Sequence, residues 1–246
     1  MKRVMLRVAY DGTNYVGWQK QPNGTAVEEM LNRALCDLTG ENIEVIGASR
    51  TDSGVHAMDN VAVFDTESRI PGDKFSFALN QRLPGDIVVQ SSCEVDPEFH
   101  PRYAKCNKTY EYRIYNAVQP NPLTARYSYF FHAKLDTLAM QRAAQYIVGE
   151  HDFASFCASG AQVKTTVRTV YSLDVLTEGD EITIRIRGNG FLYNMVRIIA
   201  GTLIQVGTGA FTPEQVKEIV DLCDRTSAGP TAPACGLTLK KIEYEE

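Results

Sequence analysis

A guanidinium, a carboxylate, an imidazole and a glycine fall within residues 50–57 (RTDSGVHA). They follow an apolar, β-prone run at residues 43–46, so we expect a loop leaving a strand, where folds often place reacting groups. A single Asp in a loop is more often a turn former or helix cap. Residues two apart on an extended segment share a face, however, which would put Arg50 beside Asp52. A neighbouring cation keeps a carboxylate ionised, as a nucleophile requires, so Asp52 is a candidate nucleophile.

Arg197 is the second residue whose type and position suggest chemistry. Hydrophobic periodicity predicts an apolar helix over residues 191–206 with this arginine in its middle. Its side chain could run along a polar edge of the helix. Alternatively it is a buried cation that faces a buried anion, because an unpaired buried charge is costly. The apolar surroundings favour a pair, with Asp52 as the partner.

Residues 102–115 combine positive charge with aromatic rings. Four cations stand against the single anion Glu111. The cations are Arg102, Lys105, Lys108 and Arg113, and the interleaved rings are Tyr103, Tyr110, Tyr112 and Tyr115. Cations suit phosphates and rings suit unstacked bases, which fits a nucleic acid. An amphipathic strand at residues 109–115 with one face in a core explains the pattern equally well.

Composition indicates an ordinary globular protein. The 246 residues, 44% of them apolar, allow one large or two modest domains with a normal core. The net charge of −5 argues mildly against nucleic-acid binding, but says little about local fields. We see no signal peptide, and the most apolar stretch, residues 195–206, is too short to span a membrane. Six scattered cysteines and four separated histidines favour a reduced, cytoplasmic protein without a metal site.

The elements that must position these residues form two halves of similar order. The first half predicts strands at residues 4–10, 43–48, 60–64 and 87–90, with helices from Thr25 to Gly40 and over 73–82. Thr25 and Glu28 have the spacing of a capping box, and Gly40 supplies a helix end. The second half predicts strands at residues 109–115, 168–176, 181–187 and 237–244, with helices from Asp136, over 191–206 and after Pro213.

This repeated β-α-β-β-α-β order indicates an α+β fold of two ferredoxin-like halves. We expect their antiparallel sheets to lie side by side with a central active-site cleft. The domains are predicted at residues 1–103, which carry the Asp52 loop, and 104–246, which carry Tyr110 and Arg197.

Five motifs together resemble the TruA family of tRNA pseudouridine synthases. They occur in order across almost the whole chain, at residues 10–19 (YDGTNYVGWQ), 50–57 (RTDSGVHA), 108–112 (KTYEY), 191–201 (FLYNMVRIIAG) and 236–239 (GLTL). The resemblance implies isomerisation of uridine to pseudouridine at positions 38, 39 and 40 of the tRNA anticodon stem-loop. It further implies a homodimer that uses neither metal nor organic cofactor.

The same resemblance assigns roles to individual residues. It makes Asp52 the catalytic aspartate, Tyr110 the ring that stacks on the base, and Arg50 the arginine tied to base flipping. It makes Arg197 the partner of the catalytic aspartate, and Leu237 a residue that lines the pocket. The motif at residues 10–19 receives no assigned role, and its Trp18 could simply belong to the core.

Physical reasoning agrees with this assignment. Uridine inside a stem must leave the stack before its face can react, at a cost of a few kcal/mol. Stacking on Tyr110 and a wedge at Arg50 would partly offset that cost. Asp52 would then attack either C6 of the uracil or C1′ of the ribose. Lys105, Lys108 and Arg168 are the candidates for phosphate contacts.

Two other classes of function fit parts of the pattern. A non-catalytic RNA-binding protein would need cations and rings but no paired Asp52. A hydrolase with Asp52 as nucleophile, as in retaining glycosidases, would need a second carboxylic acid as proton donor. No motif supplies that acid, and we expect Asp59 and Asp65 to be solvated.

Overall fold

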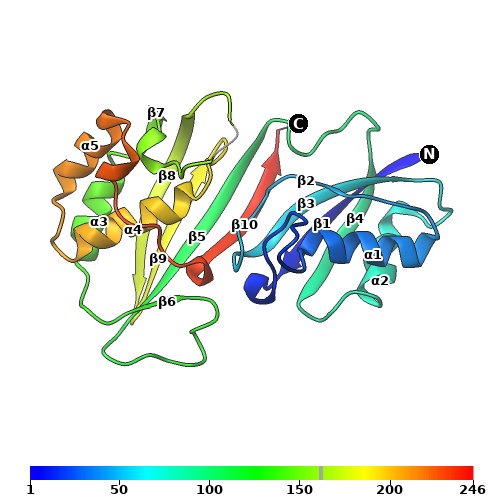
Figure 1. The fold of residues 1–246 in the computed structure, drawn as a ribbon, viewed down its shortest axis with the longest axis horizontal. Helices are drawn as coiled ribbons and strands as arrows, with labels where there is room; N and C mark the ends of the chain where they lie inside the picture. Colours follow the sequence, from blue (N-terminus) through cyan, green and yellow to red (C-terminus); the bar gives the residue numbers. More distant parts are fainter. Residues whose placement is uncertain (161–162, 246) are drawn as a thin grey trace. The chain divides into compact units, whose positions relative to one another are not determined.

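The computed structural model describes residues 1–160 and 163–245. Its contacts divide the chain into two compact units (Figure 1). Unit 1 joins Met1–Lys105 to the C-terminal stretch that begins at Leu239, and unit 2 covers Cys106–Thr238. The fold is mixed α and β, with a large sheet and five α-helices in the described residues. None of these helices is long and apolar enough to cross a membrane.

Unit 1 is an antiparallel sheet with two helices. Its strands are β1 (Lys2–Tyr10), β2 (Ile46–Gly47), β3 (His56–Thr66), β4 (Ile87–Val95) and most of β10 (Leu237–Tyr244). The strand order is β4-β1-β3, and both β2 and β10 pair with β3. Helices α1 (Val27–Thr39) and α2 (Phe75–Asn80) contact each other, and α2 packs on β4. Short 3₁₀ turns occupy Gly12–Asn14 and Gly72–Lys74.

Alternation along β1 builds the core of unit 1. Val4, Leu6 and Val8 are fully buried, whereas the residues between them are partly exposed. Burial of a side chain of this size contributes about 1.5–3 kcal/mol. The strand is therefore firmly fixed, and its last residue, Tyr10, leads directly into the candidate site.

The start of α1 differs from the predicted capping box. The Thr25 side chain does not cap the helix. The N–H groups of Val27 and Glu28 donate instead to the carbonyl oxygens of Gly17 and Trp18, at 3.1 and 3.0 Å. A segment from elsewhere in unit 1 thus satisfies donors that a helix start leaves open. The predicted helix end is confirmed, with the C-cap glycine in the left-handed region.

The strand predicted at residues 43–48 is reduced to the two residues of β2. The backbone N–H of Val45, which a longer strand would use in its ladder, donates to Asn32 Oδ1 at 2.9 Å. β2 ends at Gly47, so Arg50 and Asp52 lie on the connection that follows this strand. The segment that carries them is held by other contacts.

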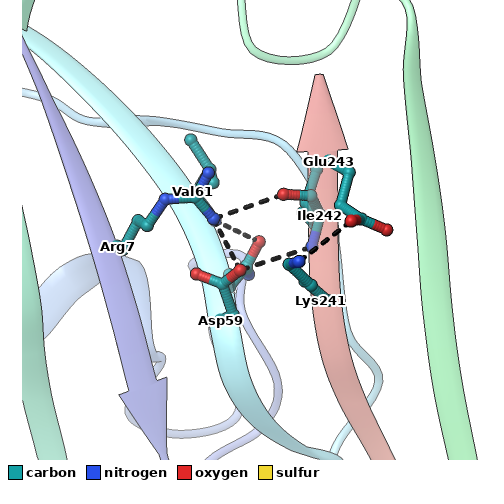
Figure 2. Close-up of polar contacts among 7 residues, drawn as sticks. Arg7, Asp59, Val61, Lys241, Ile242 and Glu243 are labelled. Carbon is teal, nitrogen blue, oxygen red and sulfur yellow. Dashed lines mark hydrogen bonds and ion pairs between the residues drawn. The ribbon is translucent and has the colours of Figure 1, made fainter. Parts of the chain in front are cut away.

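Strand β10 belongs mostly to unit 1, whereas the sequence places it in the domain predicted at residues 104–246. Arg7 of β1 pairs with Asp59 of β3 at 2.5 Å and also donates to the carbonyl oxygen of Ile242, at 3.2 Å (Figure 2). The N–H of Ile242 reaches the Asp59 carboxylate at 3.5 Å. These contacts attach the C-terminal strand to β1 and β3, and unit 1 accordingly includes the chain from Leu239 onward.

Unit 2 combines five strands, most of them paired antiparallel, with three helices. Its strands are β5 (Cys106–Asn116), β6 (Tyr129–Phe131), β7 (Gly149–Asp152), β8 (Val167–Glu178) and β9 (Glu181–Gly188). They follow the order β5-β9-β8-β7, and β6 pairs in parallel with β5. Its helices are α3 (Thr137–Ala144), α4 (Met195–Gly207) and α5 (Pro213–Leu222), with α3 packed against β8, α4 and α5.

Helix α4 begins later than the predicted start at residue 191. Asn194, the N-cap residue, has φ 58°, in the left-handed region, so the helix cannot continue backwards through it. Asn adopts this conformation more readily than most residues. Arg197 therefore lies in the first turn of α4, which corrects its predicted place in the middle of a longer helix.

Candidate active site

Asp52 lies on the connection between β2 and β3, which we call the Asp52 loop (residues 48–55). The N–H of Val55 donates to the carbonyl oxygen of Asp52 at 3.1 Å and closes a tight turn. The Asp52 side chain is half-buried, and Ser53 beside it is exposed. A carboxylate in this position can be reached by a ligand while its backbone is held.

A buried polar network anchors the loop before Asp52. The hydroxyl oxygens of Tyr10 and Thr51 lie 2.7 Å apart. Asn60 Nδ2 donates to Tyr10 Oη at 3.2 Å and to the carbonyl oxygen of Ser49 at 3.0 Å. All four residues are buried. Such a network fixes the backbone on which Asp52 sits, because each buried polar group would lose free energy without its partner.

Arg50 is exposed and belongs to a cationic group in unit 1. Arg102 donates from Nη2 to the carbonyl oxygen of Gly47 at 3.1 Å, on the chain just before the Asp52 loop. Burial and the nearby positive charge of Arg50 lower the pKa of the Arg102 guanidinium. Two like charges are therefore close together beside the loop. This arrangement suits an anionic ligand.

Two stacked rings, from His100 and Tyr103, flank Arg102 in the sequence. The Tyr103 side chain is 79% exposed, and its ring stacks on the ring of His100 with centroids 4.2 Å apart. Lys105, also exposed, closes the segment. Our site prediction included Lys105 but omitted Arg102, Tyr103 and His100. The signal for Arg102 and Tyr103 in the sequence is a ring directly after an arginine, within the cations and rings of residues 102–115.

The sequence suggested that Asp59 and Asp65 are solvated, but in the structure each of them is paired with an arginine. Asp59 is paired with Arg7. Arg3 donates from Nε and Nη2 to the two carboxylate oxygens of Asp65, at 2.8 and 2.7 Å, and these hydrogen bonds lower the pKa of Asp65. A proton donor for a glycosidase needs a raised pKa. Asp65 therefore lacks the property that the hydrolase hypothesis requires.

Arg197 is half-buried, and its guanidinium donates hydrogen bonds to residues of unit 2. Its Nε donates to the carbonyl oxygen of Ala232 at 2.8 Å, and its Nη1 donates to Asn194 Oδ1 at 2.9 Å. A cation in the first turn of a helix is disfavoured by the helix dipole. The hydrogen bonds to Ala232 and Asn194, and not the helix dipole, are what the arginine gains at this position.

Two tyrosines of β5, Tyr110 and Tyr112, have largely buried side chains with different contacts. Tyr112 is fully buried, and its hydroxyl donates to the carbonyl oxygen of Pro233 at 2.9 Å. Burial raises the pKa of this hydroxyl, so Tyr112 is a core residue. Tyr110 is 9% exposed, and its ring meets Phe191 edge-on with centroids 5.3 Å apart. Part of the predicted nucleic-acid pattern is thus an ordinary amphipathic strand.

The Arg168 side chain donates hydrogen bonds to backbone close to it in the sequence. Its Nη1 donates to the carbonyl oxygens of Thr165 and Val167 at 3.0 and 2.6 Å, and burial lowers its pKa. Lys108, on β5 opposite Gly188 of β9, is half-buried.

Leu237, the first residue of β10, is buried. The predicted site residues therefore divide into Arg50, Asp52 and Lys105 in unit 1 and Lys108, Tyr110, Arg168, Arg197 and Leu237 in unit 2.

The cysteines and histidines of the described residues are spread over both units. All six cysteines lie within the described ranges. In the same ranges, no group of three or more His, Cys, Asp or Glu side chains could hold a metal ion.

Comparison with known proteins identifies the family. The sequence pattern of the family described as tRNA pseudouridine synthase matches residues 7–104 and 143–245. A protein of Acetivibrio thermocellus named tRNA pseudouridine synthase A is 50% identical over 244 residues, which cover 99% of this chain and 100% of that protein. Proteins of the same name from Ruminiclostridium cellulolyticum and Brevibacillus brevis are 50% and 49% identical, over 99% of this chain and their full length. The chain therefore belongs to the TruA family of tRNA pseudouridine synthases, which are isomerases.

Proposed function

We propose that this enzyme converts uridine to pseudouridine at positions 38, 39 and 40 of the tRNA anticodon stem-loop, with Asp52 as the nucleophile. The observation that carries this proposal is the half-buried Asp52 carboxylate on a closed turn, within the motif that resembles the family's catalytic loop. The relatives named tRNA pseudouridine synthase A support the substrate class.

The proposed reaction rearranges one nucleotide without adding atoms. The bond between N1 of uracil and C1′ of ribose breaks, and a bond between C5 and C1′ forms. The hydrogen on C5 leaves as a proton, and N1 gains a proton. Asp52 would form a transient bond to C6 or to C1′, which splits one difficult exchange into two easier steps.

The other site residues would prepare this reaction. Tyr110 would stack on the flipped uracil, and Leu237 would line the pocket around it. Arg50 would hold the flipped base outside the stem. Removing a base from the stack costs a few kcal/mol. Arg197 would pair with Asp52, which suits a cation that its own helix disfavours.

Phosphate contacts would come from exposed and half-buried cations. Lys105, Lys108 and Arg168 remain our candidates, although Arg168 already donates to two carbonyl oxygens. We add Arg102 and Tyr103, because a cation beside an exposed ring fits RNA. Arg50 and Arg102 beside the Asp52 loop support phosphate binding at this place, although the total charge is acidic.

At the level of the molecule, we propose two ferredoxin-like halves with their sheets side by side around the active-site cleft, and a homodimer that works in the cytoplasm. The strand order β4-β1-β3-β2 in unit 1 supports the first half, and β5-β9-β8 in unit 2 supports three strands of the second.

The test measures the hydrogen that the reaction releases from C5 of uridine. Pseudouridine has the mass of uridine, but its formation releases the C5 hydrogen. The purified protein is incubated with unmodified tRNA carrying tritium at C5 of uridine. We expect tritium release from a tRNA with uridine at positions 38–40, and none from a matched tRNA with cytidine there. Binding without release would favour the non-catalytic RNA-binding protein, and release of free uracil would favour the hydrolase.

A further inference from the structure

We propose that the Tyr10–Gln19 motif sets the position of Asp52, and that Tyr10, Gly12 and Gly17 act as positioning residues. We call residues 10–18 the bracing segment. This inference rests on the proposed function, because it assumes that Asp52 reacts with the substrate. All the contacts that carry it lie within unit 1.

The bracing segment contacts the Asp52 loop through backbone hydrogen bonds. The N–H of Trp18 donates to the carbonyl oxygen of Thr51 at 3.0 Å, immediately before Asp52. The carbonyl oxygen of Tyr15 accepts from the N–H of Gly54 at 3.3 Å and from Ser53 Oγ at 3.2 Å, immediately after Asp52. The residues on both sides of Asp52 are therefore held by one short stretch of chain.

Gly17 lies where only a glycine fits. Its φ is +110°, a backbone conformation that other residues rarely adopt. An added Cβ would lie 2.6 Å from the carbonyl oxygen of Thr51 and 3.1 Å from the carbonyl carbon of Asp52. The obstacle is backbone, so a side chain at this position would displace the chain at Asp52 itself.

Gly12 makes a second close approach at the other end of the segment. A Cβ there would clash with the backbone carbonyl of Val55. The N–H of Gly12 also donates to Nδ1 of His56 at 3.1 Å, where β3 begins. The Asp52 loop is thus enclosed between two glycine contacts, one at each end of the bracing segment.

The bracing segment is itself held by the fold. Helix α1 donates two first-turn N–H groups to the carbonyl oxygens of Gly17 and Trp18. The Trp18 side chain is 1% exposed and packs near the Tyr10 ring, with centroids 5.9 Å apart. Two fixed elements, β1 and α1, therefore determine where the segment lies. Through its hydrogen bonds to the residues beside Asp52, the segment fixes where Asp52 lies.

This arrangement predicts a specific kinetic defect. A misplacement of about 1 Å at a reacting group can slow a reaction about a hundredfold. Displacement of Asp52 should leave tRNA binding intact, because the phosphate contacts are made elsewhere. If these residues position Asp52, their loss should lower the rate at which the bound complex reacts and leave the affinity for tRNA unchanged.

The experiment compares Gly17→Ala with Gly40→Ala. Gly40 has φ +74° and no atom within 4 Å of an added Cβ, so alanine strains the backbone there without touching the loop. We measure single-turnover tritium release, tRNA affinity and the urea midpoint of each variant. Gly17→Ala should release tritium about a hundredfold more slowly, with affinity within about twofold of wild type. Gly40→Ala should lose stability but keep the wild-type rate. Equal rates in the two variants would overturn the proposal.

A milder pair of variants decides the matter if Gly17→Ala fails to fold. Tyr10→Phe and Thr51→Val each remove the hydroxyl contact of 2.7 Å. If the contact positions Asp52, each should slow the bound reaction, and the double variant should be no slower than the slower single one. Unchanged rates, or additive losses, would contradict the proposal. Asp52→Asn in the same series tests the proposed function separately, because it removes the reacting carboxylate and leaves the contacts of the bracing segment with Thr51, Ser53 and Gly54 in place.

Discussion

Single residues of the candidate site are held by partners that lie far away in the sequence. Asp52 could be found because its motif is contiguous, with an arginine and a histidine within a few positions. The hydroxyl contact between Tyr10 and Thr51 joins residues 41 positions apart. No local sequence pattern predicts a contact over this separation, so the bracing role of the Tyr10–Gln19 motif could not be predicted from the sequence.

Tyr110 gives a test of base stacking at this scale. Tyr110→Phe keeps the ring and should keep most activity, whereas Tyr110→Ala should lose about 1–3 kcal/mol of stacking. Turnover of both variants is measured with the same tRNA. Equal losses in the two variants would mean that the hydroxyl, and not the ring face, matters.

Arg197 gives a second test, with a control that the chain itself supplies. Arg197→Met removes hydrogen bonds to Ala232 and Asn194, each worth about 1 kcal/mol, and should cost only a few degrees in melting temperature. It should reduce turnover far more, because Asp52 loses the cation that we propose as its partner.

Arg225 holds the same stretch of chain through Ala228, Gly229 and Thr231. Arg225→Met should therefore lower the melting temperature by a similar amount and leave turnover almost unchanged. If the two variants lose turnover equally, Arg197 supports the segment and has no direct role at Asp52.

At the scale of elements, local signals predicted well and tertiary signals did not. The bounds of β10 agree with the prediction, as does the end of α1 at Gly40, because strand alternation and a left-handed glycine act locally. The start of α1 and the length of β2 were wrong, since carbonyl oxygens and a side chain from other elements satisfy their N–H groups. The start of α4 depended on one asparagine in an unusual conformation.

The pairing of β1 with β3 can be tested through Arg3 and Asp65, which face each other across the two strands. The folded pKa of Asp65 lies below its unfolded value of about 4, so the pair stabilises the fold above that pH. Asp65→Asn should lower the free energy of unfolding near pH 7 by about 1 kcal/mol or less. The difference from wild type should shrink as pH falls below about 4, as read from urea midpoints. A difference that grows with acid would contradict the assigned pairing.

For the whole molecule, the acidic balance and the proposed RNA substrate are compatible because charge is unevenly placed. Arg50 and Arg102 lie close enough for one charge to affect the other, although the net charge is −5. Binding of a nucleic acid depends on such local cations, and each phosphate contact releases counterions.

Affinity for tRNA should therefore fall steeply as salt rises. Arg102→Ala and Lys105→Ala should each weaken binding and reduce the slope of log affinity against log salt by about one. Lys74→Ala, an exposed lysine paired with Asp73, serves as the control and should change neither quantity. Affinity that is independent of salt would exclude phosphate contacts as the main source of binding.

The central claim is that Asp52 is the nucleophile, and Asp52→Asn tests it most directly. Asparagine keeps the shape and can hold a turn, but it has no anionic oxygen to attack carbon. Single-turnover tritium release and tRNA affinity are measured beside Asp73→Asn, which changes an exposed aspartate on the 3₁₀ turn before α2. We predict that Asp52→Asn loses at least about a thousandfold in rate and keeps its affinity for tRNA, while Asp73→Asn behaves as wild type. Release by Asp52→Asn at a rate near that of wild type would contradict the account.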